Sequence, residues 1–195
     1  TDYLNLFNNN IHITSSNASS QSAYIYYLSR IASYNNNFVT TGAGYAINQY
    51  GNLTKSDFNN YYTAGSNIGY HNSNNRSNLA AWKSSTGMDS KSISSNPDYV
   101  SATDLHVRGT DLDGKGRRHP YVITKDIDGQ NRNTTTPDIG ADEFDIPAAN
   151  DAGILSYVEP IAAFAAGSKS VKVIIKNFGS DSLKSATVKW KVNGT

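Results

Sequence analysis

Short apolar segments alternate with asparagine-rich polar segments along the first seventy residues. Three stretches align with one another, at residues 4–11, 31–38 and 54–61. Each is followed by a glycine- or serine-rich stretch and a second short apolar segment. Such alternation of short apolar runs with turn residues predicts β-strands. A repeat of twenty-odd residues with at least two strands per repeat predicts a β-solenoid, with one coil for each repeat.

Asparagines occupy matching positions in the three aligned stretches. Asn10, Asn37 and Asn60 fall in register, at spacings of 27 and 23 residues. Asparagine adopts left-handed backbone angles at sharp bends more readily than most residues, and its amide both donates and accepts hydrogen bonds. We therefore expect these three side chains to form a ladder between coils. Solvated loops are the alternative, which three in-register copies disfavour.

The repeat also predicts which residues form the core of the solenoid and where the solenoid ends. Ile11 and Phe38 are expected to point inward, whereas Tyr61 is expected near the end of the stack, where its hydroxyl reaches water. Residues 78–83 then predict a short helix with Ser77 as its N-cap. A solenoid needs a cap, and we expect Trp82 to plug its open end.

Two motifs near residue 140 carry a family resemblance. They read Asp-Ile-Asp-Gly-Gln-Asn-Arg at residues 126–132 and Asp-Ile-Gly-Ala-Asp-Glu-Phe at residues 138–144. Together with the preceding order of segments, roughly residues 3 to 145 resemble the C-terminal end of secreted bacterial right-handed parallel β-helix repeat proteins. The resemblance implies that residues 1–146 hold the last coils and closing cap of such a helix, in a secreted or cell-surface protein. The charged stretch within residues 107–122 departs from the family, whose members often have a Ser-Pro-Ala-Ile-Asp-type strand there.

The carboxylates of these motifs have two interpretations. The favoured one is structural, with Arg132 held bidentately by Asp138 or Glu143 in a lock that pins the final strand. The alternative is calcium at Asp126 and Asp128, which supply only the first two positions of a calcium loop. We predict no catalytic, cofactor-binding or metal-binding residue beyond this alternative. His12, His71, His106 and His119 show no ligand spacing and are interpreted as surface or turn residues.

The last forty-five residues have a different pattern. Residues 147–150 form an expected linker, and three strands are predicted at 151–158, 170–179 and 184–194. Their order resembles the beginning of bacterial adhesion-associated immunoglobulin-like domains. Such a β-sandwich usually has about seven strands and ~100 residues, so residues 151–195 are expected to be its N-terminal part, continued downstream.

Composition narrows the function. Charged residues make up 17% with a net charge of +1 and no basic stripe, so nucleic acid is not an expected partner. There is no cysteine for a disulfide or thiolate site, and no apolar run long enough to span a membrane. Tyrosine is abundant, with thirteen residues. Some are candidates to stack on sugar rings, with stacking between coils as the equally weighted alternative: Tyr24, Tyr26, Tyr50, Tyr62 and Tyr70.

The expected function is therefore that of a non-catalytic structural and binding segment. Its partners would be polysaccharide or cell-surface glycans and further domains of the same polypeptide. The alternative is the C-terminal portion of a polysaccharide lyase or glycoside hydrolase whose catalytic coils lie upstream of residue 1.

Overall fold

The computed structural model describes residues 3–27, 30–51, 55–119, 123–146, 149–160 and 166–191. The chain forms two compact units, Thr1–Asp145 and Ile146–Thr195. Their division lies one residue before the boundary expected after residue 146. The described residues are predominantly β-structure and turns, with one α-helix and one short 3₁₀ helix, so the fold class is all-β.

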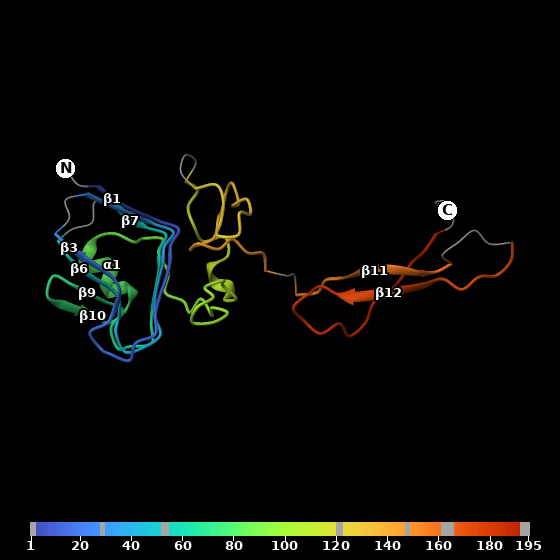
Figure 1. The fold of residues 1–195 in the computed structure, drawn as a ribbon, viewed down its shortest axis with the longest axis horizontal. Coiled ribbons are helices and arrows are strands. Elements are labelled where there is room, and N and C mark those ends of the chain that lie inside the picture. The colour runs from blue at the N-terminus through green and yellow to red at the C-terminus, as the bar shows by residue number, and fades with distance from the viewer. Residues whose placement is uncertain are drawn as a thin grey trace. The chain divides into compact units, whose positions relative to one another are not determined.

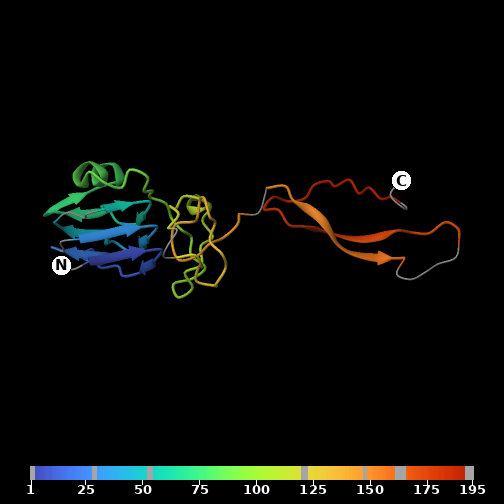
Figure 2. The ribbon, with the colours of Figure 1, turned by 90° about the horizontal axis from the view of Figure 1, so that it is seen from above.

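Three small, separate parallel sheets form the first part of the N-terminal unit (Figures 1 and 2). Each takes one strand from each sequence repeat, and β10 adds an antiparallel edge to the third sheet. The first sheet contains β1 (Tyr3–Phe7), β4 (Arg30–Tyr34) and β7 (Lys55–Asp57). The second contains β2 (Asn10–Ile13), β5 (Asn37–Thr40) and β8 (Asn60–Thr63). The third contains β3 (Gln21–Tyr26), β6 (Tyr45–Tyr50), β9 (Gly69–His71) and β10 (Asn74–Arg76).

The register predicted from the aligned asparagines is the register of the strands. Asn10 pairs with Asn37, and Asn37 pairs with Asn60. The spacing of 27 and then 23 residues therefore measures the chain length between equivalent strands. The connection from β5 to β6 (residues 41–44) is shorter than that from β2 to β3 (residues 14–20), so the spacing shortens in a connection and leaves the strand pairing unchanged.

Apolar residues from all three sheets meet in one core. The buried members are Ile25, Ile31, Phe38, Ala46, Ile47, Tyr61, Ile68 and Trp82. Phe38 is fully buried, as predicted, and Ile11 packs against the cluster while half-buried. Tyr61 lies on the terminal strand of its sheet, as expected, but the prediction that it meets water is wrong, because it is 0% exposed. Its ring stacks on that of Phe38, with the ring centroids 5.6 Å apart. Its hydroxyl finds a buried acceptor, Asp89, in place of water.

The asparagine ladder lies one residue earlier than expected. Asn9 Nδ2 donates to Asn36 Oδ1 at 2.8 Å, and Asn36 Nδ2 donates to Asn59 Oδ1 at 3.0 Å. In the predicted column, Asn60 Nδ2 donates to Asn37 Oδ1 at 2.7 Å, which confirms that rung.

Asn10 does not join the predicted column. Its amide donates to the carbonyl of Leu105 and accepts from the N–H of Ala141. The reason is that the closing segment of the unit lies over the first repeat and supplies nearer backbone partners.

The three successive positions at each bend therefore have different structural roles. The first position of each run has a left-handed backbone, with φ of 54° at Asn8, 55° at Asn35 and 57° at Phe58. The second position builds the ladder, and the third begins the next strand. Asparagine suits the first position because a short polar side chain tolerates left-handed angles.

Asn36→Ala tests the ladder. Asn36 is fully buried, and its Nδ2 also donates to the carbonyl of Leu6 at 2.7 Å. Alanine leaves these buried groups without partners, so we expect a loss of about 1–3 kcal/mol in the free energy of unfolding, measured by urea denaturation. Asn17→Ala, in an exposed loop, is the control and should change stability by less than about 0.5 kcal/mol. Equal stabilities of the two variants would contradict a structural ladder.

One helix covers the last strands of the repeats. α1 spans Leu79–Thr86, and its N-cap is Asn78, whose side chain accepts from the N–H of Ala81 at 2.9 Å. The predicted cap at Ser77 is therefore wrong by one residue, because Asn78 is the residue with the extended backbone and the capping geometry. Trp82 is 0% exposed, and its ring lies 5.7 Å from that of Tyr61. A Cβ at Gly69 would lie 2.7 Å from the Trp82 ring, so the indole requires glycine in the neighbouring strand.

Residues 88–145 complete the N-terminal unit with little regular structure. They contain the 3₁₀ helix η1 (Thr110–Leu112). They also contribute to a second buried cluster, in which Val39 of β5 packs with Tyr99, Val107, Leu112 and Ile139. The charged stretch at residues 111–118 joins the repeats through the backbone of Arg117. There Asn35 Nδ2 donates to the Arg117 carbonyl at 2.6 Å, and the Arg117 N–H donates to Asn35 Oδ1 at 2.7 Å.

The C-terminal unit contains a two-stranded antiparallel sheet. Its strands β11 (Ala152–Glu159) and β12 (Lys172–Asn177) correspond to the first two strands expected there. The third is wrong over residues 184–191, which are not in a strand. Val188 and Trp190 are 44% and 64% exposed, so burial of an apolar face does not select a strand here. Residues 147 and 148 of the expected linker and 192–194 of the third strand lie outside the described residues.

Candidate functional site

A cluster of tyrosines lies on the third sheet of the N-terminal unit. Its members are Tyr24, Tyr26, Tyr27, Tyr45, Tyr50 and Tyr70, and together they are called the tyrosine surface. Alternation along β3 turns Ile25 inward and leaves Tyr24 and Tyr26 54% and 56% exposed. Tyr27, directly after β3, is 67% exposed.

The rings of the tyrosine surface also contact one another. Tyr26 pairs in register with Tyr50, and their ring centroids lie 5.5 Å apart. The ring centroids of Tyr50, on β6, and Tyr70, on the adjacent strand β9, lie 6.1 Å apart. Stacking between repeats is therefore present, which is one of the two interpretations of these residues. It also holds the exposed rings in place, so both interpretations apply to the same side chains.

Tyr62 does not belong to this surface. It lies on β8, in the second sheet, and packs half-buried against the cluster of Val39 and Leu112. This candidate for sugar stacking is therefore separate from the other four, because strands of different sheets face different sides of the unit.

The residues of the predicted lock do meet, with a different geometry. Arg132 is buried, and its Nη1 donates to Glu143 Oε2 at 3.3 Å. Its Nη2 donates to the carbonyls of Gly140 and Ala141, and its Nε donates to that of Lys125. The bidentate pairing is therefore wrong, because three of the four hydrogen bonds of this guanidinium go to backbone carbonyls.

Asp138 is buried beside the lock without contacting Arg132 through a hydrogen bond. Its carboxylate accepts from the N–H groups of Gly114 at 2.6 Å and Phe144 at 2.7 Å. Burial raises the pKa of Asp138 to about 7, against the opposing effect of these two donors. Burial likewise lowers the pKa of Arg132, while Glu143 acts in the other direction. These shifts belong to a desolvated structural centre.

The calcium alternative meets competition from the backbone. Asp126 Oδ1 accepts from the N–H groups of Asp128 and Gln130, and its Oδ2 accepts from that of Glu143. Asp126 thus shapes the turn that contains Gly129. A calcium ion at Asp126 and Asp128 would have to share these oxygens.

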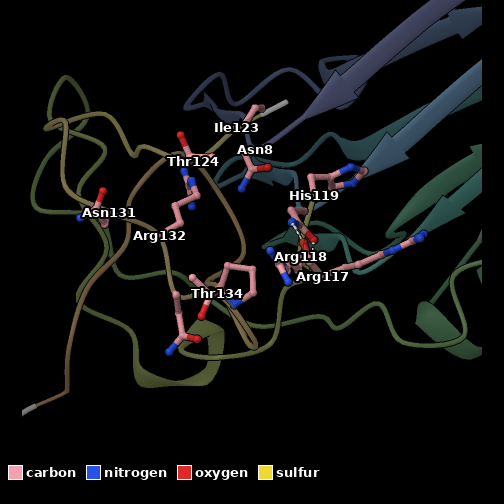
Figure 3. Close-up of a pocket in the computed structure, with 12 residues that line it drawn as sticks. Asn8, Arg117, Arg118, His119, Ile123, Thr124, Asn131, Arg132 and Thr134 are labelled. Carbon is pink, nitrogen blue, oxygen red and sulfur yellow. Dashed lines mark hydrogen bonds between the residues drawn. The ribbon is translucent and has the colours of Figure 1, made fainter. Parts of the chain in front are cut away.

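A cavity of about 230 Å³ lies next to the lock (Figure 3). It is lined by residues of the first two repeats, such as Asn8 and Asn35, and by the irregular segment, including Arg117, Arg118 and Thr134. Among the described residues that line it, none carries a carboxylate. The cavity therefore lacks the pair of acids that glycoside hydrolysis needs.

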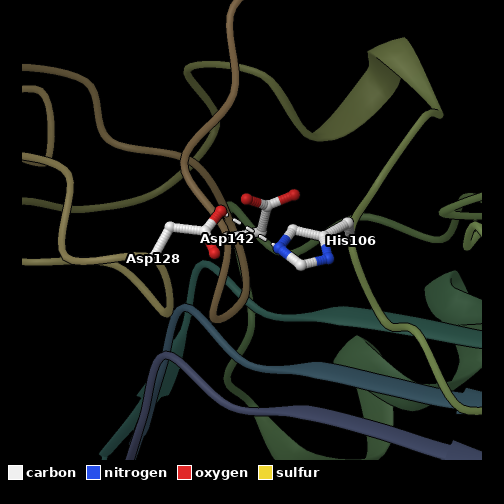
Figure 4. A group of neighbouring side chains, drawn as sticks. All are labelled: His106, Asp128 and Asp142. Atoms are coloured by element: carbon white, nitrogen blue, oxygen red, sulfur yellow. Dashed lines mark hydrogen bonds and ion pairs between the residues drawn. The ribbon is translucent and has the colours of Figure 1, made fainter.

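A histidine and three aspartates meet elsewhere in the irregular segment. His106, Asp128 and Asp142 each offer one ligand atom, and these atoms lie within 4.8 Å of one another (Figure 4). Asp104 contacts the same imidazole from its other side, at Nδ1. The hydrogen bond with Asp104, followed by that with Asp128, raises the pKa of His106 above its usual value.

Little in the sequence pattern indicates this group. His106 was interpreted as a surface or turn residue, and it is half-buried between two carboxylates. The available signal was Asp104 two residues before His106, together with Asp142 inside the second motif. For His71 the interpretation is wrong, since it is 3% exposed and packs its ring at 5.8 Å from that of Trp82.

Comparison with protein-family models, with curated proteins and with solved structures finds no match for this chain. Among the described residues, no helix is long and apolar enough to cross a membrane. The geometry thus defines an all-β protein with an exposed tyrosine surface and a buried, arginine-centred closing segment.

Proposed function

We propose that this chain is a non-catalytic carbohydrate-binding segment of a secreted or cell-surface bacterial protein. In this proposal residues 1–146 are the last coils and closing cap of a right-handed parallel β-helix. Residues 151–195 begin an immunoglobulin-like sandwich that connects to further modules. The tyrosine surface carries the proposal, because exposed rings held on a sheet are suited to stack on the apolar faces of sugar rings.

The β-helix part is supported by the parallel pairing of strands one repeat apart. The non-catalytic part is supported by the engagement of the signature residues in structural hydrogen bonds. The polar atoms of Arg132, Asp138 and Glu143 form hydrogen bonds with backbone groups and with one another. The sandwich part is supported by β11 and β12, whose exposed apolar residues include Ile154 and Ile174 and require a covering layer.

The glycan-binding role is tested with Tyr26→Ala and Tyr50→Ala in the full chain. Each removes one ring of an adjacent pair, and we expect at least about a tenfold loss of affinity for the glycans that the unmodified chain retains on an array, equivalent to about 1.4 kcal/mol. Isothermal titration with the best glycan gives the affinities, and circular dichroism verifies folding.

Tyr157→Ala is the matched control for this experiment. Tyr157 is 53% exposed on β11, outside the tyrosine surface, so its loss should leave glycan affinity unchanged. Undiminished binding by both Tyr26→Ala and Tyr50→Ala would remove the tyrosine surface from the proposal. Degradation of an acidic polysaccharide by the purified chain would contradict the non-catalytic assignment itself.

A further inference from the structure

We propose that His106, Asp128 and Asp142 bind a divalent transition-metal ion, with Zn²⁺ as the best match to their chemistry. The three residues come from two segments of the irregular region that are more than twenty residues apart in sequence. His106 Nε2 and Asp128 Oδ2 face each other at 3.0 Å, with the Asp142 carboxylate beside them (Figure 4). One imidazole nitrogen with carboxylate oxygens is a donor set that zinc accepts.

Asp104 supplies a hydrogen-bond partner for the imidazole nitrogen of His106 that would not bind the metal. Its carboxylate accepts the hydrogen bond of His106 Nδ1, and it also accepts from the His106 backbone N–H. A partner at Nδ1 fixes the ring orientation and directs Nε2 toward the other two carboxylates. Metal-binding histidines almost always have such a partner on the nitrogen that does not bind the metal.

Asp142 is the buried part of the group. It is 4% exposed, and its Oδ2 accepts from the N–H of Val107 at 2.9 Å. Its other oxygen has no hydrogen-bond donor among the described residues. Since a buried carboxylate is costly without compensating charge, this position favours a nearby cation.

The group carries an excess of negative charge, which a bound cation would neutralise. Asp104, Asp128 and Asp142 bring three carboxylates to one imidazole. Within the described parts of the chain, no lysine or arginine forms an ion pair with any of them. A divalent ion supplies the missing positive charge and replaces the hydrogen between His106 Nε2 and Asp128.

Metal binding requires the three ligand atoms, which lie within 4.8 Å of one another, to move together around the ion. Zinc bonds to nitrogen and oxygen ligands are about 2.0–2.2 Å long. Asp128 can make this movement because it lies half-exposed on the turn shaped by Asp126. Bound metal would tie this turn to His106, which β-sheet pairing does not do. The proposal is independent of glycan binding.

The test is titration of the full chain, stripped of metal with a chelator, separately with Zn²⁺, Co²⁺ and Ca²⁺. We expect one Zn²⁺ per chain by isothermal titration and visible absorption bands from coordinated Co²⁺. His106→Ala and Asp128→Asn should each weaken binding at least a hundredfold. Asp104→Asn should weaken it by about 10–100-fold, as removal of second-layer partners does, with unchanged stoichiometry.

His12→Ala is the control, because His12 contacts Thr41 and Tyr99 but none of the three ligands, so its loss should leave the affinity unchanged. Circular dichroism separates loss of binding from loss of folding, and Asp128→Asn, on an exposed turn, keeps the test decisive where His106→Ala unfolds. The proposal is overturned by a folded chain that binds no Zn²⁺. It is equally overturned by binding that survives both variants, or by tighter binding of Ca²⁺ than of Zn²⁺.

Discussion

Trp82→Ala is expected to destabilise the N-terminal unit by about 3–5 kcal/mol, the usual cost of removing a large buried aromatic side chain. Trp82 is 0% exposed and contacts the rings of Tyr61 and His71. The indole also fills the space above Gly69, where no side chain is available to replace it. Urea denaturation followed by far-ultraviolet circular dichroism measures the change.

The cost includes a buried polar network below the indole. Asp89 is 1% exposed and accepts hydrogen bonds from Trp82 Nε1 at 2.8 Å and from the Tyr61 hydroxyl at 3.2 Å. The side chains of Ser56, Asn59 and Ser92 donate to the same carboxylate. A buried carboxylate with all its hydrogen bonds made stabilises the folded state. Removal of any one donor leaves the buried charge of Asp89 with fewer hydrogen bonds and so lowers stability. Burial and the nearby Asp89 charge accordingly raise the pKa of Tyr61 well above its usual value.

Trp82→Phe separates packing from this network. Phenylalanine retains an aromatic ring but lacks the N–H that donates to Asp89. We expect a loss of about 1.5–3 kcal/mol, the range for a hydrogen bond to a charged group. Val100→Ala, at a residue 45% exposed, is the control and should be within about 0.5 kcal/mol of the parent. A Trp82→Ala variant as stable as this control would show that the indole does not close the core.

The strand register was predictable because asparagines recur in the sequence at a similar spacing from one repeat to the next. Asn10, Asn37 and Asn60 align by sequence alone, and the strands that contain them pair accordingly. The phase of the ladder was not predictable, because neighbouring asparagines differ only in where the bend directs their side chains. The left-handed angles at Asn8 and Asn35 set this direction, and they arise from the folded corner.

Features that depend on distant contacts were the ones missed. Tyr61 was expected to meet water, and it is covered by Asp89 and Trp82 from the segment after the repeats. The histidine group likewise joins His106 to Asp142, which no local pattern connects. Trp82 is expected to plug the end of the stack, and the structure shows it 0% exposed, with its ring against that of Tyr61. Periodicity thus predicts pairing, whereas partners brought in by irregular segments require the structure.

Arg132→Ala is the second change with a large expected effect. Breaking a buried ion pair by removing one partner costs about 3–5 kcal/mol, because the other charge stays buried. Here the side chains of Arg132 and Glu143 are 6% and 13% exposed, respectively. The guanidinium also ties the carbonyls of Gly140 and Ala141 to the turn after Lys125.

The effect should extend from the lock to the repeats. Gly140 donates its N–H to the carbonyl of Asn35 and accepts from Asn8 Nδ2, while the Ala141 N–H donates to Asn10 Oδ1. Arg132 therefore holds the strip of backbone that covers the asparagine corners. Gly140 itself has φ of 111°, and a Cβ there would lie 2.3 Å from Asn10 Oδ1, so this close approach requires glycine.

The prediction distinguishes a lock from a merely buried pair. Arg132→Ala should lower the unfolding free energy and also speed limited proteolysis within residues 123–146, because the carbonyls lose their donors together with the charge. Glu143→Gln, which keeps a similar shape and an acceptor oxygen, should cost less than Arg132→Ala. If charge pairing alone mattered, the double variant Arg132→Met/Glu143→Leu would restore full stability. We expect it to remain less stable than the parent, because three backbone carbonyls still lack the guanidinium. An unchanged melting temperature for Arg132→Ala would exclude the lock.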